Sequence, residues 1–224
     1  MLTILYEDNH LLGVFKPPGL STMGRPEGEE TLLTRAKDYL KQKYCKPGNV
    51  YLGVVSRLDT PVSGVVLFAR TSKAAARINE QFRTHAVEKT YHALVEGNLY
   101  PEETQLVDFM CEDPRHRKMW ITKSADGADV KEAKLHYRKL AMTGKISHIQ
   151  VLLETGRKHQ IRLQLSHHGF PILGDRKYGA RRMFPDGIAL HARSLAVTHP
   201  VSGEPVKLTA PFPASWKSYG FALE

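Results

Sequence analysis

An aspartate, Asp59, stands two residues after an arginine, Arg57, in the segment Val-Val-Ser-Arg-Leu-Asp-Thr-Pro-Val-Ser-Gly at 54–64. Apolar runs from Val50 to Val55 and from Gly64 to Ala69 flank it, and they predict two buried strands joined by a loop. A carboxylate held between rigid strands is placed for chemistry, and an aspartate can attack the anomeric carbon of a sugar. The alternative is an ordinary aspartate turn, in which the side chain bonds only nearby backbone groups.

A second segment combines cations with histidines and amides. Residues 154–169 read Glu-Thr-Gly-Arg-Lys-His-Gln-Ile-Arg-Leu-Gln-Leu-Ser-His-His-Gly, and Phe-Pro-Ile-Leu-Gly-Asp follows directly. The apolar spacing between 158 and 166 fits either a strand or a helix. His167 and His168 come nearest to a metal-binding pair, but adjacent residues of a helix diverge, so we interpret them as non-ligands.

Together the two segments resemble the RluA family of RNA pseudouridine synthases. The matching motifs are Arg-Leu-Asp-x-x-x-Ser-Gly at 57–64, Gly-Arg-x-His-Gln-Ile-Arg at 156–162 and His-Gly-x-Pro-Ile-x-Gly-Asp at 168–175. Three further pieces fit the family pattern, namely an opening motif at 6–19, Lys-x-Tyr-x-Ala-x-Val-x-Gly at 89–97 and Leu-His-Ala at 190–192. Each match alone is weak, but all occur in the family's order between residue 6 and about residue 212.

The resemblance implies a reaction and the residues that carry it. Pseudouridine synthases detach uracil from C1′ of its ribose, rotate it and rejoin it through C5, so this chain would be an isomerase that needs no redox cofactor. Asp59 matches the family's essential aspartate, Tyr91 the tyrosine that packs against the target base, and Arg162 the cation that pairs with the aspartate. A core tyrosine and a surface arginine are the alternatives for Tyr91 and Arg162. The motifs leave open whether the aspartate attacks C1′, attacks the base or assists a glycal route.

The resemblance also implies that Arg57 enters the RNA helix and helps to displace the target base, which is unreachable while stacked. A structural salt bridge is the alternative for Arg57. The family usually has histidine before this arginine, whereas this chain has Ser56, which puts any histidine-dependent contact in doubt.

Further cations are candidates for binding RNA. The basic segment 113–120 occupies the place of the family's RNA-gripping loop, where Trp120 could stack on a base; its alternative is a solvated charge run with Trp120 in the core. A second basic cluster at 176–182 fits backbone contacts or an exposed loop. The RNA-binding candidates are Arg57, Arg115, Arg117, Lys118, Arg157 and Lys158.

The elements that must position these residues are mostly short strands. Periodicity predicts strands at 3–6, 11–15, 50–55, 64–69, 87–95, 134–140 and 147–153, and a hairpin of 195–198 with 206–209. Helical spacing predicts helices at 31–44, capped by Thr31, and at 72–83, capped by Ser72. This pattern is typical of an α+β protein with a mainly antiparallel sheet. The resemblance implies the pseudouridine synthase fold, with a mixed sheet, flanking helices and a central catalytic cleft, as one domain over 1–224 without the family's frequent N-terminal RNA-binding appendage.

Composition favours a polyanionic partner. The 224 residues include 32 Lys and Arg against 23 Asp and Glu, a formal charge of +9 that suits RNA or DNA, although a merely basic globular protein is the alternative. Two cysteines, Cys45 and Cys111, suggest no disulfide framework and fit a reducing compartment. We find no leader segment, no apolar run near the ~20 residues of a membrane span, no phosphate loop and no zinc spacing. We therefore expect a cytoplasmic protein without metal or cofactor.

Three hypotheses for function follow. The first is an RNA pseudouridine synthase acting on specific uridines of structured rRNA or tRNA, as a monomer without an obligate protein partner. The second is a catalytically silent RNA-binding protein on the same scaffold, which would be free to lose Asp59, Tyr91 or Arg162. The third is a glycoside or nucleoside hydrolase, whose two-carboxylate form needs a second acid; Asp175 is interpreted as structural. The motifs do not reveal which RNA or which uridine is modified.

Overall fold

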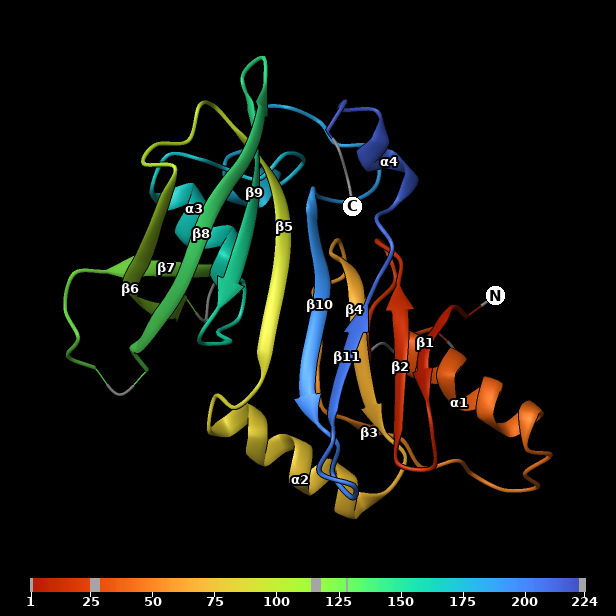
Figure 1. Ribbon diagram of the computed structural model, residues 1–224. Helices are drawn as coiled ribbons and strands as arrows, with labels where there is room; N and C mark the ends of the chain where they lie inside the picture. The colour runs from red at the N-terminus through yellow and green to blue at the C-terminus, as the bar shows by residue number, and fades with distance from the viewer. Residues whose placement is uncertain (1, 25–28, 114–117, 128, 222–224) are drawn as a thin grey trace. The chain divides into compact units, whose positions relative to one another are not determined.

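The computed structural model describes residues 2–24, 29–113, 118–127 and 129–221. Contacts within the chain divide it into two compact units, Met1–Glu88 with Ala192–Phe212 and Lys89–His191 with Pro213–Glu224. Each unit combines antiparallel strands with helices, which confirms the predicted α+β class (Figure 1). A single domain over the whole chain stays a prediction.

The first unit contains a sheet in the order β1–β2–β4–β10–β11, with β3 beside β4. Its β1–β2, β2–β4, β3–β4 and β10–β11 pairs are antiparallel. The strands are β1 (Ile4–Glu7), β2 (Leu11–Lys16), β3 (Gly53–Val54), β4 (Ser63–Ala69), β10 (Leu190–Thr198), which begins in the second unit, and β11 (Pro205–Thr209).

Two helices, α1 (Leu32–Lys43) and α2 (Ser72–Arg83), cover opposite faces of this sheet. Alternate residues of a strand point to opposite faces. Val65 and Leu67 of β4 pack in the cluster that contains α2, whereas Val66 and Phe68 pack in the cluster that contains α1. Every residue of β4 is therefore buried, and the loop before it starts from a rigid base.

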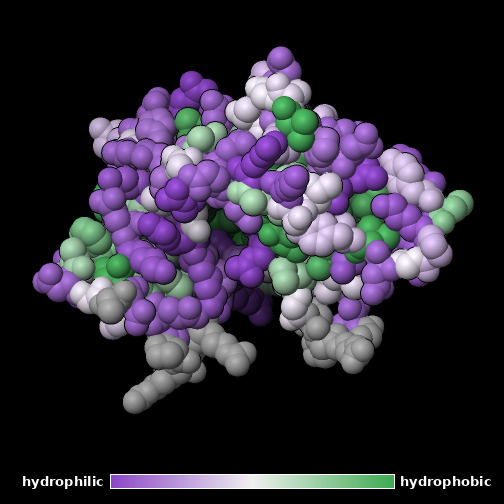
Figure 2. All heavy atoms as spheres, turned by 90° about the horizontal axis from the view of Figure 1, so that it is seen from below, coloured by the Kyte–Doolittle hydropathy of each residue, from purple (hydrophilic) through white to green (hydrophobic). Residues whose placement is uncertain are grey.

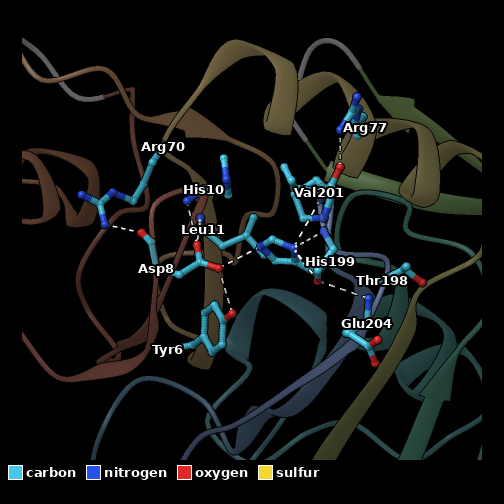
Figure 3. Close-up of polar contacts among 12 residues, drawn as sticks. Tyr6, Asp8, His10, Leu11, Arg70, Arg77, Thr198, His199, Val201 and Glu204 are labelled. Atoms are coloured by element: carbon cyan, nitrogen blue, oxygen red, sulfur yellow. Dashed lines mark hydrogen bonds and ion pairs between the residues drawn. The ribbon is translucent and has the colours of Figure 1, made fainter.

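Two turns of the first unit meet through polar side chains (Figure 3). The carboxylate of Asp8 accepts hydrogen bonds from the N–H groups of His10 and Leu11, both at 2.7 Å, and from the Tyr6 hydroxyl at 2.9 Å. Nε2 of His199, from the turn between β10 and β11, lies 2.8 Å from the same carboxylate. These contacts tie the β1–β2 turn to the β10–β11 turn.

The second unit contains an antiparallel sheet in the order β5–β9–β8–β6–β7. Short helices accompany it, and buried residues of β6, β7, β8 and α3 form one core cluster with Tyr178. The elements are β5 (Glu88–Glu96), β6 (Glu103–Asp113), β7 (Lys118–Thr122), β8 (Lys131–Thr143), β9 (Ile146–Leu153), α3 (Gln160–His167), the single 3-10 turn η1 (Arg176–Tyr178) and α4 (Ala214–Lys217).

The predicted elements are largely confirmed, with longer bounds for β8 and β10. Thr31 caps α1 as predicted, but α2 is capped by Thr71, whose side chain accepts the N–H of Ala74, so the prediction of Ser72 as the cap is wrong. Only Gly53 and Val54 of the predicted strand 50–55 pair with β4. The ambiguous stretch 158–166 is helical from Gln160.

Candidate active site

Asp59 lies in the loop between β3 and β4, partly exposed. Backbone bonds hold this loop, because the N–H of Val62 donates to the Asp59 carbonyl at 3.0 Å and the N–H of Gly19 donates to the Thr60 carbonyl at 2.8 Å. The Thr22 hydroxyl also donates to the Leu58 carbonyl at 3.0 Å. The loop is therefore fixed on both sides of the carboxylate.

Lys16, the last residue of β2, is fully buried beneath this loop. Its ammonium donates to the carbonyls of Pro17 at 2.9 Å, Leu20 at 2.8 Å and Thr60 at 3.0 Å. Burial lowers the pKa of Lys16 to about 7, and the charge of Asp59 acts in the opposite direction. A single buried cation thus joins the segment 17–20 to the Asp59 loop, a role that the sequence analysis did not identify.

The backbone at Gly64 shows why the Arg-Leu-Asp-x-x-x-Ser-Gly motif ends in glycine. Its φ of +128° is a conformation that other residues rarely adopt. A Cβ there would stand 2.3 Å from the carbonyl oxygen of Ala192 in β10, far inside contact distance. Glycine is therefore required where β4 passes the backbone of β10, five residues after Asp59.

Arg57 is exposed, and it forms no ion pair with the residues that the structure describes, which disfavours the structural salt bridge. Ser56 has a structural contact of its own, because its hydroxyl accepts the N–H of Leu67 at 2.8 Å. Serine in place of the family's histidine therefore fastens the start of the loop to β4.

Tyr91 belongs to the second unit, in β5, where it lies opposite Val151 of β9 and is partly exposed. Partial exposure leaves its side chain accessible, so the core-tyrosine alternative is disfavoured. Lys89 lies on the same face of β5, because residues two apart in a strand point to the same side.

Arg162 lies in α3 and is 5% exposed, so its interpretation as a surface arginine is wrong. Its Nε donates to Oδ2 of Asp175 at 2.7 Å and its Nη2 to Oδ1 at 2.9 Å, a bidentate pair inside the second unit. Asp175 is thus structural, as interpreted, but its partner was missed because nothing in the loop pattern indicates it. The pairing of Arg162 with Asp59 stays a prediction.

Tyr178 supports the start of α3. Its hydroxyl accepts the N–H of Met119 in β7 at 3.3 Å and lies 2.8 Å from Nδ1 of His159. The guanidinium of Arg162 lies over its ring, 5.2 Å from the centroid. His159 precedes the helix with a φ of 55°, so the Gly-Arg-x-His turn bends sharply before Arg162.

The RNA-binding candidates are only partly described. Arg115 and Arg117 lie outside the described residues. Lys118 is exposed, Lys158 pairs with Glu112, and Trp120 is 57% exposed, so its placement in the core is wrong. A pocket of about 440 Å³ opens between β7 and α3, and its lining includes Lys118, Trp120, His167 and Tyr178. Figure 2 shows hydrophilic residues over most of the face in view.

Among the described residues there is no group of three or more His, Cys, Asp or Glu side chains that could hold a metal ion. No helix in the described part of the chain has the length and apolar character needed to cross a membrane.

Comparisons with known proteins agree with these motifs. Residues 10–167 match the family model described as RNA pseudouridylate synthase. The chain is 35% identical to tRNA pseudouridine synthase C of Pectobacterium carotovorum subsp. carotovorum, covering 97% of this chain and 61% of that protein. It is 36% identical to ribosomal large subunit pseudouridine synthase D of Xanthomonas campestris pv. campestris, covering 95% and 66%. The chain thus spans about two thirds or less of the length of these two relatives.

A third relative and two solved structures are similar to this chain over most of their own length. The chain is 33% identical to tRNA pseudouridine synthase C of Yersinia pestis, covering 97% of this chain and 89% of that protein. Human RNA pseudouridylate synthase domain containing 1 has a TM-score of 0.75 at 26% identity, covering 95% of this chain and 84% of the other. Human RNA pseudouridylate synthase domain containing 4 shares the fold, with a TM-score of 0.82 at 23% identity over 99% and 94%. The family model and the relatives together place this chain in the RluA family of RNA pseudouridine synthases.

Proposed function

We propose that the chain isomerises uridine in structured RNA to pseudouridine, with Asp59 as the carboxylate that acts on the target nucleotide. The observation that carries the proposal is the Arg-Leu-Asp loop itself, which is held by the ammonium of Lys16 and the N–H of Gly19 and leaves Asp59 partly exposed. A group that must meet a substrate has to be both fixed and accessible.

The other assigned residues have supporting roles in the proposal. Tyr91 would pack against the target base, and Arg162 would orient the aspartate. Arg57, exposed two residues before Asp59, would take the place of the base when it leaves the stack, a step that costs a few kcal/mol. The uracil leaves C1′ and returns through C5, so no redox partner is required.

The substrate in the proposal is rRNA or tRNA, because the relatives are named for both kinds of RNA. The formal charge of +9 supports binding to a polyanion. Action as a monomer in the cytoplasm, where such RNA is made and used, is part of the same proposal.

The test measures tritium release from C5-labelled uridine in total tRNA and rRNA transcripts. Wild-type protein should release tritium, and Asp59→Asn should bind RNA but release none. Asp38→Asn, on the exposed side of α1, is the matched control and should behave as wild type. RNA binding without tritium release by wild-type protein would indicate the silent RNA-binding alternative, and free uracil among the products would indicate a hydrolase.

A further inference from the structure

Lys89 and Arg157 are two cations that meet in the second unit. Nζ of Lys89 donates to the carbonyl of Thr155 at 3.3 Å and lies 3.7 Å from the position that a Cβ of Gly156 would occupy. Arg157 is the next residue, and its charge affects the pKa of Lys89. Both side chains are partly exposed, so a ligand can reach them.

No carboxylate forms an ion pair with either cation in the described ranges of the chain. Among the described residues, their side chains donate only to backbone carbonyls: Lys89 to Thr155, and Nε of Arg157 to Glu132 at 3.0 Å. Two cations that share a partly buried position without an anion repel each other. Such a pair is stabilised by any anion that binds it.

The neighbouring carboxylates are engaged elsewhere. The carboxylate of Glu132 lies 2.8 Å from Nζ of Lys134. The carboxylate of Glu154 accepts a hydrogen bond from Gln105 at 2.7 Å. Glu132 is therefore paired with Lys134 and with neither member of the cation pair.

The turn that carries Arg157 is rigid. Oε1 of Gln160 accepts the N–H of Arg157 at 3.0 Å and the hydroxyl of Thr155 at 2.7 Å, while Nε2 of Gln160 donates to the carbonyl of Lys134 at 3.0 Å. No side chain caps the N-terminus of α3, which begins at Gln160 and adds a partial positive charge near the turn. The cations are held in place before any ligand arrives.

We propose that Lys89 and Arg157 form a phosphate-binding site that holds one phosphodiester of the RNA strand carrying the target uridine. This inference rests on the proposed function, because it names the part of the RNA that these residues hold. A guanidinium can bind two phosphate oxygens at once, and an ammonium supplies a point charge beside it. Lys89 shares its strand face with Tyr91, so the phosphate would lie beside the residue expected to pack against the target base.

The first test is the salt dependence of RNA binding, measured in the Asp59→Asn background so that no turnover occurs. Each phosphate neutralised on single-stranded RNA contributes roughly −0.7 to the slope of log K against log[salt]. Lys89→Met and Arg157→Met should each make that slope shallower and weaken binding equally for unrelated RNA sequences. Between 50 and 200 mM salt the wild-type surface should lose about 2.6-fold more affinity than the double variant Lys89→Met/Arg157→Met, which removes both cations from the one phosphate, and each single variant should fall between the two. Lys145→Met, exposed in the β8–β9 turn, is the matched control and should leave the slope unchanged.

The second test uses pH. Burial, and then the charge of Arg157, lower the pKa of Lys89 to about 8. If only the charged ammonium holds the phosphate, affinity should fall by about tenfold from pH 7 to pH 9 as the proton leaves, because the charged fraction falls by that factor. Lys89→Arg keeps its charge at pH 9 and should retain affinity. The charged and titratable neighbours of Lys89 are the same in both proteins and include Glu88 and Tyr91 on β5, Glu132 and Lys134 on β8, and Glu154, Arg157 and Lys158 in the turn before α3.

The outcomes separate this inference from the function on which it rests. A wild-type enzyme that releases tritium, together with a Lys89→Met variant whose salt slope and pH profile match wild type, overturns the phosphate site alone. Absence of tritium release by wild-type protein overturns the proposed function. Thermal melts of each variant establish that it is folded, and Lys89→Arg serves if Lys89→Met does not fold.

Discussion

Replacing Lys16 by methionine removes a buried ammonium and keeps the length of the side chain. The carbonyl of Thr60 would retain a donor, the N–H of Gly19 at 2.8 Å. The carbonyls of Pro17 and Leu20 would lose the ammonium that donates to them, which costs about 1–3 kcal/mol for each buried acceptor. Loss of a desolvated charge offsets part of this cost. We therefore expect Lys16→Met to lower the free energy of unfolding by about 2–4 kcal/mol.

The same residue makes stability depend on pH. The pKa of Lys16 is about 7 in the folded protein because of burial, whereas a lysine of an unfolded chain titrates near 10.4. Between these values the unfolded state binds more protons, so the free energy of unfolding of wild-type protein rises with pH, by up to about 1.4 kcal/mol per pH unit from this residue. Below the lower value both states carry the proton, and the contribution is constant. The gap between wild type and Lys16→Met should therefore widen from pH 7 to pH 9.

Urea unfolding at pH 7, 8 and 9 measures this gap. Titration of other groups affects both proteins alike and cancels in the difference. Lys41→Met, on the exposed end of α1, is the control and should match wild type at every pH. A gap that stays constant across the three pH values would refute the argument that burial lowers the pKa of Lys16, and a variant as stable as wild type would refute its role in holding the carbonyls.

Three further predictions concern stability. Asp175→Asn should cost about 3–5 kcal/mol in urea unfolding because it removes the charged half of a buried bidentate pair with Arg162, and adding Arg162→Met should recover part of that loss; strict additivity would contradict the pair. Burial lowers the pKa of His148 to about 4, so wild-type stability should fall by up to about 1.4 kcal/mol per unit as pH drops below 6.5, and His148→Gln should remove this dependence in unfolding titrations. Gly64→Ala should prevent folding or lower the melting temperature sharply, while Gly144→Ala, also at positive φ but in open space, should cost only about 1 kcal/mol.

The sequence predicted the elements that have a clear helical or strand period or a continuous apolar run, such as β4, and it missed β6, which has neither. The helix at 31–44 and the strand at 87–95 have clear periods, and both are confirmed. β6 was not predicted, because apolar residues occupy both of its faces: Leu106 is buried, while Val107 is 47% exposed. β7, which pairs with β6, is only five residues long and begins directly after residues 114–117, which lie outside the described ranges.

Long-range polar contacts were beyond what spacing alone can indicate. Lys16 was read only as part of an opening motif, since nothing local shows that its ammonium is buried against the carbonyl of Thr60. The link from Asp8 to His199 joins turns at the two ends of the chain. The motifs indicated candidate functional residues, but the hydrogen-bond and ion-pair partners of those residues are set by the tertiary fold.

Arg162 has its charge balanced inside the second unit by Asp175, which uses two of the five N–H donors of the guanidinium. Because this pair is neutral overall, a further carboxylate at Arg162 would be attracted less strongly than by an unpaired arginine. In the predicted pairing with Asp59, Arg162 would then act mainly by orienting the carboxylate through directed N–H hydrogen bonds. A positive charge without those bonds would not replace the arginine. We expect Arg162→Lys, which keeps the charge but loses the planar fork, to abolish tritium release as fully as Arg162→Met. Turnover near the wild-type rate in the lysine variant would show that a positive charge suffices.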